Sequence, residues 1–232
     1  MLEAEKLCAW YGAAQILFDV SFNVAHGEVV ALMGRNGAGK TTTMKAIMGL
    51  VGRRAGSVRF DGEELLRLKT FQIARLGLGW VPEDRRIFTE LSVRENLDVG
   101  RRGAEGRVAW TPERLFQLFP NLAEMRERLG GRMSGGEQQM LTVARTLMGN
   151  PLLVLLDEPS EGVAPVIVEQ MANTIVELKK EGLSVLLSEQ NIHFAQLVCD
   201  RAYVLEKGQL QWHGRMADLA NDVTVQRRLL SV

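Results

Sequence analysis

A glycine-rich segment at residues 34–41 has the residue types and spacing of a phosphate-binding loop. It follows an apolar run, VVALM, and its residues are Gly34, Arg35, Asn36, Gly37, Ala38, Gly39, Lys40 and Thr41, with Thr42 next in the chain. The glycines allow successive N–H groups to point inward, and the start of a helix adds partial positive charge there. We expect Lys40 to reach the terminal phosphates of a nucleotide and the Thr41 hydroxyl to ligate Mg²⁺. An ordinary glycine turn would not explain the Lys-Thr pair.

Two acids, Asp157 and Glu158, follow a second apolar run, LLVLL. A carboxylate at the carboxyl end of a parallel strand points toward the ligand crevice of an open α/β sheet. We expect Asp157 to hold the Mg²⁺ shell, directly or through water. Glu158 is then a candidate base for the water that attacks the γ-phosphate. Adjacent acids are often surface or capping residues, so this prediction depends on the apolar run and the phosphate loop.

A second anion-binding helix end is predicted at Ser134-Gly135-Gly136-Glu137. Ser134 is a good N-cap, and the two glycines leave the first amides uncovered. Phosphate-binding helix ends in two different parts of one chain suggest a nucleotide sandwiched between two subunits. A capped helix after a glycine loop is the structural alternative.

The elements that would position these residues alternate between strands and helices. Apolar runs predict buried strands over 29–33, 152–156 and 184–188. Helical periodicity marks 40–50 and 166–180, and a hairpin turn at Lys207-Gly208 joins 203–205 to 209–212. This alternation is typical of an α/β fold with a largely parallel sheet.

The middle of the chain has a different pattern. From about 92 to 148 the periodicity is helical, and Thr111-Pro-Glu has the form of a helix start with an N-cap. We therefore expect one domain over 1–232, with an α/β lobe from 1–88 and 149–232. A helical lobe over 89–148 would be inserted into it.

Composition excludes several other classes of protein. The 28 Lys and Arg balance 28 Asp and Glu, and 46% of the residues are hydrophobic. A general nucleic-acid binder usually carries a basic excess, and no apolar stretch here approaches the ~20 residues of a spanning helix. The N-terminus shows no secretory signal, so we expect a cytosolic protein. Cys8 and Cys199 are predicted to be buried small residues rather than a disulfide or metal site.

Together these motifs resemble the ATP-binding subunit of ABC transporters, over essentially the whole chain. MSGGEQQ is similar to the signature of that family, DEP to its strand-end motif, and Tyr11 sits where the family stacks an aromatic ring on adenine. The resemblance implies a P-loop NTPase core with a mostly parallel sheet, an antiparallel β subdomain and an inserted α-helical subdomain. It also implies ATP and Mg²⁺ as ligands, with Ser134, Gly135, Gly136 and Glu137 acting on the ATP of a second subunit. From residue type alone, Tyr11 could equally be a core or interface tyrosine.

Three positions depart from the common family wording. Glu83 stands where a Gln normally follows a strand, Ala164 where an Asp often couples the subunits, and Gln190 where a His is usual. Glu83 can still ligate Mg²⁺, and Gln190 can still donate a hydrogen bond to the γ-phosphate but cannot carry a proton. His193 lies nearby, where a surface or capping role is expected. Hydrolysis should therefore persist through Glu158 and Lys40, at an uncertain rate.

The segments that hold these departures, VPEDRRIF, SEGVAP and EQN, resemble one of the two ATP-binding subunits of the branched-chain amino acid importers. Urea and short-chain amide importers are the nearest alternative. Either assignment implies a second ATP-binding subunit, two membrane permeases and, indirectly, a solute-binding protein, with this chain peripheral on the inner face of the membrane. The segment 83–97 is the candidate docking surface for the permeases.

Two further functions are alternatives. Gln190 and Ala164 are compatible with a scaffold that dimerises on ATP but barely hydrolyses it. A DNA-repair or translation ATPase is disfavoured, because the sequence shows no sustained heptads between the phosphate loop and the signature.

Overall fold

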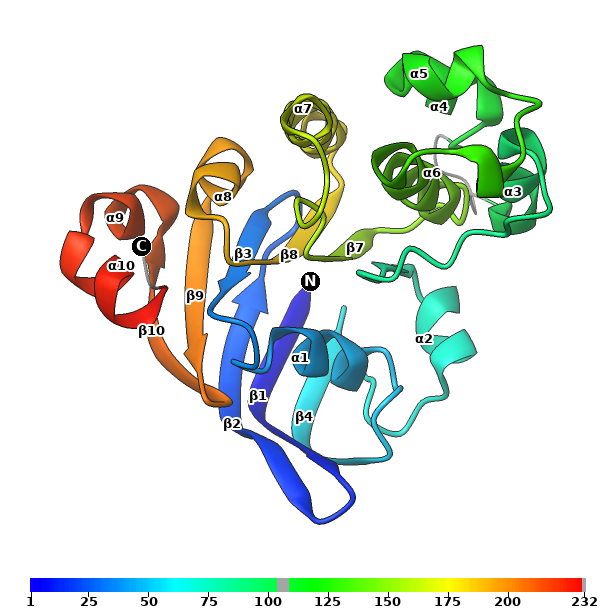
Figure 1. The fold of residues 1–232 in the computed structure, drawn as a ribbon. Coiled ribbons are helices and arrows are strands. Elements are labelled where there is room, and N and C mark those ends of the chain that lie inside the picture. The colour runs from blue at the N-terminus through cyan, green and yellow to red at the C-terminus, as the bar shows by residue number, and fades with distance from the viewer. Residues whose placement is uncertain (104–108, 231–232) are drawn as a thin grey trace.

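A six-stranded sheet forms the centre of the structure, which is a computed structural model describing residues 1–103 and 109–230. Its strand order is β10-β9-β3-β8-β7-β6, and all neighbours are parallel except β10 and β9 (Figure 1). The strands are β3 (Val29–Met33), β6 (Leu78–Val81), β7 (Leu153–Asp157), β8 (Ser184–Glu189), β9 (Arg201–Glu206) and β10 (Gln209–Arg215). Every residue of β3, β7 and β8 is buried, as expected for parallel strands covered on both faces.

A second, antiparallel sheet has the strand order β2-β1-β4-β5. Its strands are β1 (Leu2–Tyr11), β2 (Ala14–Val24), β4 (Arg53–Phe60) and β5 (Glu63–Glu64). Helix α1 (Lys40–Ile47) lies between the sheets, since its Met44 and Ile47 share one core cluster with Leu2 of β1 and Leu155 of β7. The helix that follows the phosphate loop is therefore anchored to both sheets.

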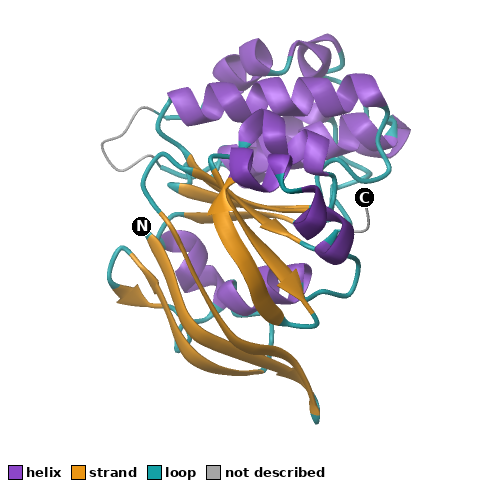
Figure 2. Cartoon of the chain, turned by 90° about the vertical axis from the view of Figure 1, so that its left-hand side faces the viewer, coloured by secondary structure: helices purple, strands orange, loops and turns teal. Residues whose placement is uncertain are grey.

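The chain between β6 and β7 forms a helical region that packs beside the central sheet (Figure 1). Its elements are α3 (Val93–Gly100), α4 (Pro112–Leu118), α5 (Pro120–Glu124), a 3₁₀ turn (Gly130–Arg132) and α6 (Gly135–Leu147). Ser92, Thr111 and Ser134 cap α3, α4 and α6, and each side chain accepts a hydrogen bond from an N3 amide. Figure 2 shows most of the helices on one side of the strands, with further helical segments between the two sheets.

The remaining helices are α2 (Thr70–Arg75), α7 (Pro165–Lys180), α8 (Ile192–Val198), α9 (Met216–Asn221) and α10 (Val223–Leu229). None of the helices in the described ranges is long and apolar enough to cross a membrane.

The predicted α/β fold, antiparallel subdomain and helical insertion are confirmed, with small corrections. The first helix was predicted to reach residue 50, but α1 ends at Ile47 because Gly49 takes a left-handed φ of 75°. Between 92 and 148 the described residues contain no strand, only an isolated bridge from Ser92 to Leu129, while 104–108 lie outside them. Cys8 and Cys199 were predicted to be buried, and each is a half-buried free thiol.

Candidate functional site

The loop between β3 and α1 closes around the ammonium group of its own lysine. Lys40 Nζ donates hydrogen bonds to the carbonyls of Gly34 and Arg35, at 2.7 and 3.1 Å. Gly34 has a φ of 151°, and a Cβ there would stand 2.5 Å from the Leu205 carbonyl oxygen of β9. Gly39, the N-cap of α1, has a φ of 111°. The predicted phosphate loop thus depends on glycine for both backbone conformation and close packing.

Asp157 joins the phosphate loop to the central strands. Its Oδ1 accepts hydrogen bonds from Thr41 Oγ1 at 3.0 Å and from Ser188 Oγ at 2.6 Å. Ser188 is the direct cross-strand partner of Asp157 in the β7–β8 ladder. The other oxygen, Oδ2, is buried and has no hydrogen-bond partner among the described residues. The carboxylate therefore has one oxygen available to a ligand.

The chemistry of this corner fits a magnesium ion. Burial raises the pKa of Asp157, against the lowering effect of the hydrogen bonds from Ser188 and Thr41. A divalent cation beside Oδ2 would favour the charged carboxylate. Mg²⁺ is usually held by one or two carboxylates together with phosphate and water oxygens. Asp157 and Thr41 supply such a small protein contribution.

Glu158 lies directly against the phosphate-loop lysine. Its Oε1 is 3.1 Å from Lys40 Nζ, and both side chains are buried, at 7% and 2% exposure. The residue has a left-handed φ of 47°, and its amide donates to the Ser188 carbonyl at 3.1 Å. Burial raises the pKa of Glu158, but a hydrogen bond with Glu161 and the charge of Lys40 outweigh burial and lower it. The side chain is thus held as a carboxylate.

Two further glutamates surround this acid, and the sequence analysis missed both. The hydrogen bond with Glu158, followed by burial and by the charges of Glu158, Glu83 and Glu189, raises the pKa of Glu161 to about 7. Glu189 is buried and accepts hydrogen bonds from the amides of Ser160, Gln190 and Asn191, each at 3.1 Å. The signal was available for Glu189, because it ends a strand adjacent to β7 at the same edge of the sheet.

A cavity of about 170 Å³ brings Glu83 to the same place as Thr41 and Asp157. Lys45, Trp80 and Asp84 also line it. The predicted Mg²⁺ ligand Glu83 thus lies beside the other two. Gln190, the predicted γ-phosphate contact, is half-buried after β8 and its amide is held by Glu189. His193 is exposed on α8, as expected for a surface residue.

The second anion-binding end is formed by Ser134 and α6. Ser134 Oγ accepts from the Glu137 amide at 3.4 Å, and Glu137 Oε2 accepts from the Ser134 amide at 2.6 Å, which completes a capping box. Gly136 packs tightly against α7, where a Cβ would stand 2.8 Å from Ile167 Cγ1. The buried side chains of α6 and α1 belong to different core clusters, and Figure 1 shows these helices on opposite sides of β7. The structure does not bring this end to its own phosphate loop.

Tyr11 ends β1, which pairs with β2, the strand whose Leu17 packs against the phosphate loop. It exposes 47% of its side chain. Two residues earlier, Ala9 pairs with Leu17 of β2, and Leu17 Cδ2 lies 2.8 Å from the position of a Cβ on Gly39. The ring is therefore accessible near the nucleotide loop and is not a core residue.

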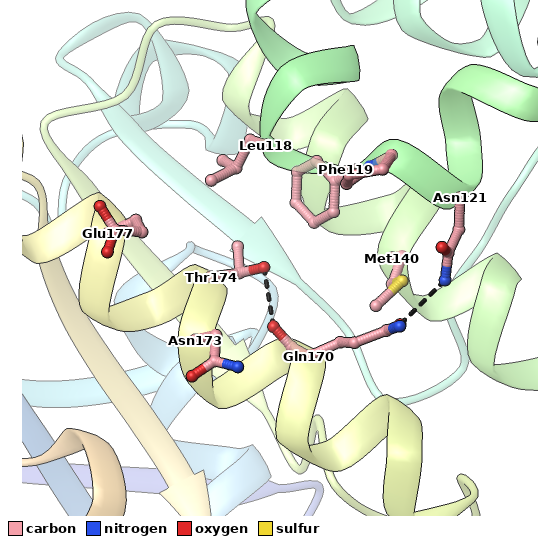
Figure 3. Close-up of a pocket in the computed structure, with 9 residues that line it drawn as sticks. Leu118, Phe119, Asn121, Met140, Gln170, Asn173, Thr174 and Glu177 are labelled. Carbon is pink, nitrogen blue, oxygen red and sulfur yellow. Dashed lines mark hydrogen bonds between the residues drawn. The ribbon is translucent and has the colours of Figure 1, made fainter.

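A separate cavity of about 260 Å³ lies between α7 and the α4–α5 pair (Figure 3). Phe119 and Met140 supply apolar surface, while Asn121 Nδ2 donates to Gln170 Oε1 across the gap at 3.0 Å. Beyond the cavity, Arg114 forms an ion pair with Glu181. Helix α7 is thus tied to the helical region by polar contacts in its first half and at its C-cap.

The phosphate loop, the acid pair and the signature end can be compared with those of known proteins. A family model described as "ABC transporter" matches residues 17–161, a range that holds the phosphate loop, the signature segment and the acid pair. The chain belongs to the ABC transporter family. Members are ATPases, so this cassette is an ATP-binding, ATP-hydrolysing subunit of an ABC transporter. Such cassettes act as dimers with membrane permease subunits.

Two kinds of curated relative resemble the cassette over almost their full lengths. A Pseudomonas aeruginosa protein, the high-affinity branched-chain amino acid transport ATP-binding protein BraG, is 44% identical over 227 residues, covering 97% of each chain. The lipopolysaccharide export system ATP-binding protein LptB of Haemophilus influenzae is 37% identical, covering 98% of this chain and 95% of the relative. These relatives serve different solutes, so similarity alone leaves the solute open.

Solved structures agree with the fold. A nucleotide-free ATP-binding cassette from an ABC transporter matches with a TM-score of 0.81 and 26% identity, covering 97% of this chain and 96% of that one. A cassette in its ADP conformation matches with a TM-score of 0.80 and 25% identity, with the same coverage. The P-loop NTPase core with its β and helical subdomains is therefore confirmed.

Proposed function

We propose that this cassette powers the uptake of branched-chain amino acids through separate membrane permeases. The observation that carries the proposal is the 44% identity with BraG over nearly the whole of both chains. The sequence segments around Glu83, Ala164 and Gln190 support it, since they resemble that importer type. In this proposal the cassette lies on the inner face of the cell membrane.

In this proposal each residue of the site has a stated role. Lys40 and the amides of residues 34–42 hold the phosphates of ATP, and Tyr11 stacks on the adenine. Thr41, Asp157 and Glu83 would hold Mg²⁺, which would neutralise charge on the phosphates. Glu158 accepts a proton from the attacking water, and Gln190 donates a hydrogen bond to the γ-phosphate.

The pair of Lys40 and Glu158 sets the order of these events. The lysine ammonium is bonded to Glu158 and to two loop carbonyls. A phosphate that draws Lys40 toward itself weakens the hold of Lys40 on Glu158. The carboxylate is then free to turn toward a water molecule. Phosphate binding and activation of the base are coupled through one ammonium group.

A second ATP-binding subunit, either another copy or a related chain, completes the site in this proposal. Ser134, Gly135, Gly136 and Glu137 would face the ATP held by that subunit. Support comes from the distance between α6 and the phosphate loop of the same chain, which leaves the signature end without a nucleotide of its own (Figure 1). We propose that residues 89–148 move as one lobe when the two subunits close.

The permease would dock where the sheet meets the helical region. A cavity of about 370 Å³ there is lined by Trp80, Phe88, Val99 and Pro151, among other residues. Phe88 and Val99 line this cavity together and expose 46% and 55% of their side chains, so it presents apolar surface to solvent. The groove overlaps the predicted docking segment 83–97. Cross-linking from Phe88→Cys to the permeases in a purified complex tests this placement, and cross-links only from the opposite face would refute it.

Two other solutes are alternatives for the same motor. Urea or a short-chain amide fits the sequence motifs, and lipopolysaccharide fits the 37% identity with LptB. The test is ATP hydrolysis by the cassette with its own permeases in vesicles, with leucine or urea supplied on its binding protein, or lipopolysaccharide. Stimulation by leucine supports the proposal, and stimulation only by urea or lipopolysaccharide overturns it.

A weakly hydrolysing scaffold is the second candidate function, and it is favoured by Gln190 and Ala164. In the assembled complex, Glu158→Gln separates the two. Loss of a catalytic base typically lowers turnover by about 10²–10⁴-fold, so a motor would lose nearly all activity. A scaffold would hydrolyse ATP at the same slow rate as its variant.

A further inference from the structure

Arg85 lies against the first turn of the signature helix. An ideal Cβ on Gly135 would stand 2.7 Å from Arg85 Nη1 and 3.3 Å from its Cζ. The guanidinium therefore occupies the space that any other residue at 135 would fill with a side chain. This contact joins the loop after β6 to the N-terminal end of α6.

The backbone of Arg85 is fastened to α6. Its carbonyl accepts hydrogen bonds from Thr142 Oγ1 at 2.9 Å and from Arg145 Nη2 at 3.4 Å. The residue holds a left-handed φ of 60°, which few side chains adopt without such support. The loop thus places the guanidinium at the helix end by several independent contacts.

The charge of Arg85 is not neutralised within the described part of the chain. Its Nε is buried without a hydrogen-bond partner, and no described carboxylate lies within ion-pair distance of the guanidinium. The next residue differs in this respect, since Arg86 Nε is 2.9 Å from Asp84 Oδ1. A partly buried, unpaired arginine is costly unless a ligand or partner uses it.

A phosphate approaching the signature end needs a positive charge there. Glu137 caps the Ser134 amide with its carboxylate, and that negative charge opposes an incoming anion. The helix end supplies only about half a positive charge. The Arg85 guanidinium offsets the carboxylate and can donate two parallel hydrogen bonds to phosphate oxygens.

We propose that Arg85 is part of the signature site and binds the phosphate chain of ATP held by a second copy of this cassette. This assignment rests on the proposed pairing of two subunits across their nucleotides. Glu83, two residues earlier, lines the cavity of its own phosphate loop. One short loop therefore touches the nucleotide of its own subunit through Glu83 and that of the partner copy through Arg85.

The test measures ATP-driven dimer formation. All variants are made in a Glu158→Gln background, which preserves ATP, and sedimentation velocity follows dimer formation against Mg·ATP concentration. Loss of a charge-assisted hydrogen bond predicts that Arg85→Gln needs at least about tenfold more ATP. Arg85→Lys should recover part of the loss, because lysine keeps the charge without the planar fork. Arg67→Gln, the charge-matched control at an exposed arginine that lines none of these cavities, should stay within about twofold of its parent.

A fluorescent ATP analogue, added at protein concentrations that keep the subunits apart, gives the second readout. Its affinity should be equal in Arg85→Gln and the parent, because the phosphate loop is untouched. Added salt should reduce the difference between Arg85→Gln and its parent in the ATP concentration needed for dimer formation, because salt screens the charge of Arg85. If Arg85→Gln fails to fold, Arg85→Met, which keeps an unbranched side chain without the charge, carries the same prediction.

The role of Arg85 and the pairing of two copies are contradicted by different results. Dimer formation by Arg85→Gln at the ATP concentration of the parent overturns the role of Arg85 alone. If Arg85→Lys does not restore dimer formation and salt does not change the loss, Arg85 has a packing role. That result also overturns the proposed role of Arg85 in phosphate binding. A parent protein that stays monomeric in saturating Mg·ATP overturns the pairing of two copies, and the assignment of Arg85 with it.

Discussion

Lys40 Nζ and Glu158 Oε1 lie 3.1 Å apart in a buried ion pair that joins the phosphate loop to the acid pair. Lys40 begins α1 and Glu158 directly follows β7, and each is assigned a separate role in hydrolysis. Their direct contact means that neither charge can be removed without changing the environment of the other.

Lys40→Ala should destabilise the fold as well as abolish ATP binding. Removing one partner of a buried ion pair typically costs about 3–5 kcal/mol, because the other charge stays buried and unpaired. In a Glu158→Gln background the same substitution should cost clearly less. Urea unfolding of the four proteins of this double-mutant cycle, without nucleotide, measures the difference. Equal costs in both backgrounds would show that the two side chains are not paired.

Ser188→Ala should raise the Mg²⁺ requirement of hydrolysis. The Ser188 hydroxyl holds Asp157 Oδ1 at 2.6 Å and so orients the oxygen left for the cation. Loss of such a supporting hydrogen bond typically weakens metal binding by about 10–100-fold. ATPase activity titrated with Mg²⁺ provides the measurement, with Asp157→Asn expected to show a larger shift. An unchanged Mg²⁺ midpoint in Ser188→Ala would contradict this support.

The raised pKa of Glu161, about 7, predicts a pH dependence of stability. The folded protein holds this proton more tightly than the unfolded chain, whose glutamate titrates near 4.5. The stabilisation is therefore complete below that pH and is lost as the pH rises to about 7. Between about pH 5.5 and about pH 8, the free energy of unfolding should fall more for the wild type than for Glu161→Gln. A fall of equal size in the two proteins would contradict the raised pKa of Glu161.

Gly34→Ala and Gly37→Ala form a matched pair in the phosphate loop. Both positions have positive φ, but a Cβ at Gly37 meets nothing within 4 Å, whereas one at Gly34 meets the Leu205 carbonyl. Gly37→Ala should cost about 1–2 kcal/mol from backbone strain alone. Gly34→Ala should cost more and should also weaken ATP binding. Thermal unfolding and nucleotide titration check the order, and equal effects would show that contact with β9 is unimportant.

The sequence could predict those parts of the site that are formed by residues close together in the chain. The phosphate loop, the acids after β7 and the capped start of α6 each carry a local pattern, and the structure has these elements at the expected places. Ser188 was missed as a partner of Asp157 because only the register of β7 and β8 brings them together. Arg85 was missed because its position depends on an unusual φ and on contacts with a helix far along the chain.

The polar contacts of α7 bear on how the chain can move. This helix has 16 residues and is therefore a stiff rod roughly 24 Å long. It begins in the loop that leaves Glu158, and its far end reaches the Arg114–Glu181 ion pair. If α7 tilts by a small angle about its N-terminus, its C-terminus is displaced further than its N-terminus. A spectroscopic label beside Arg114 would thus report changes at the acids from the opposite end of the helix.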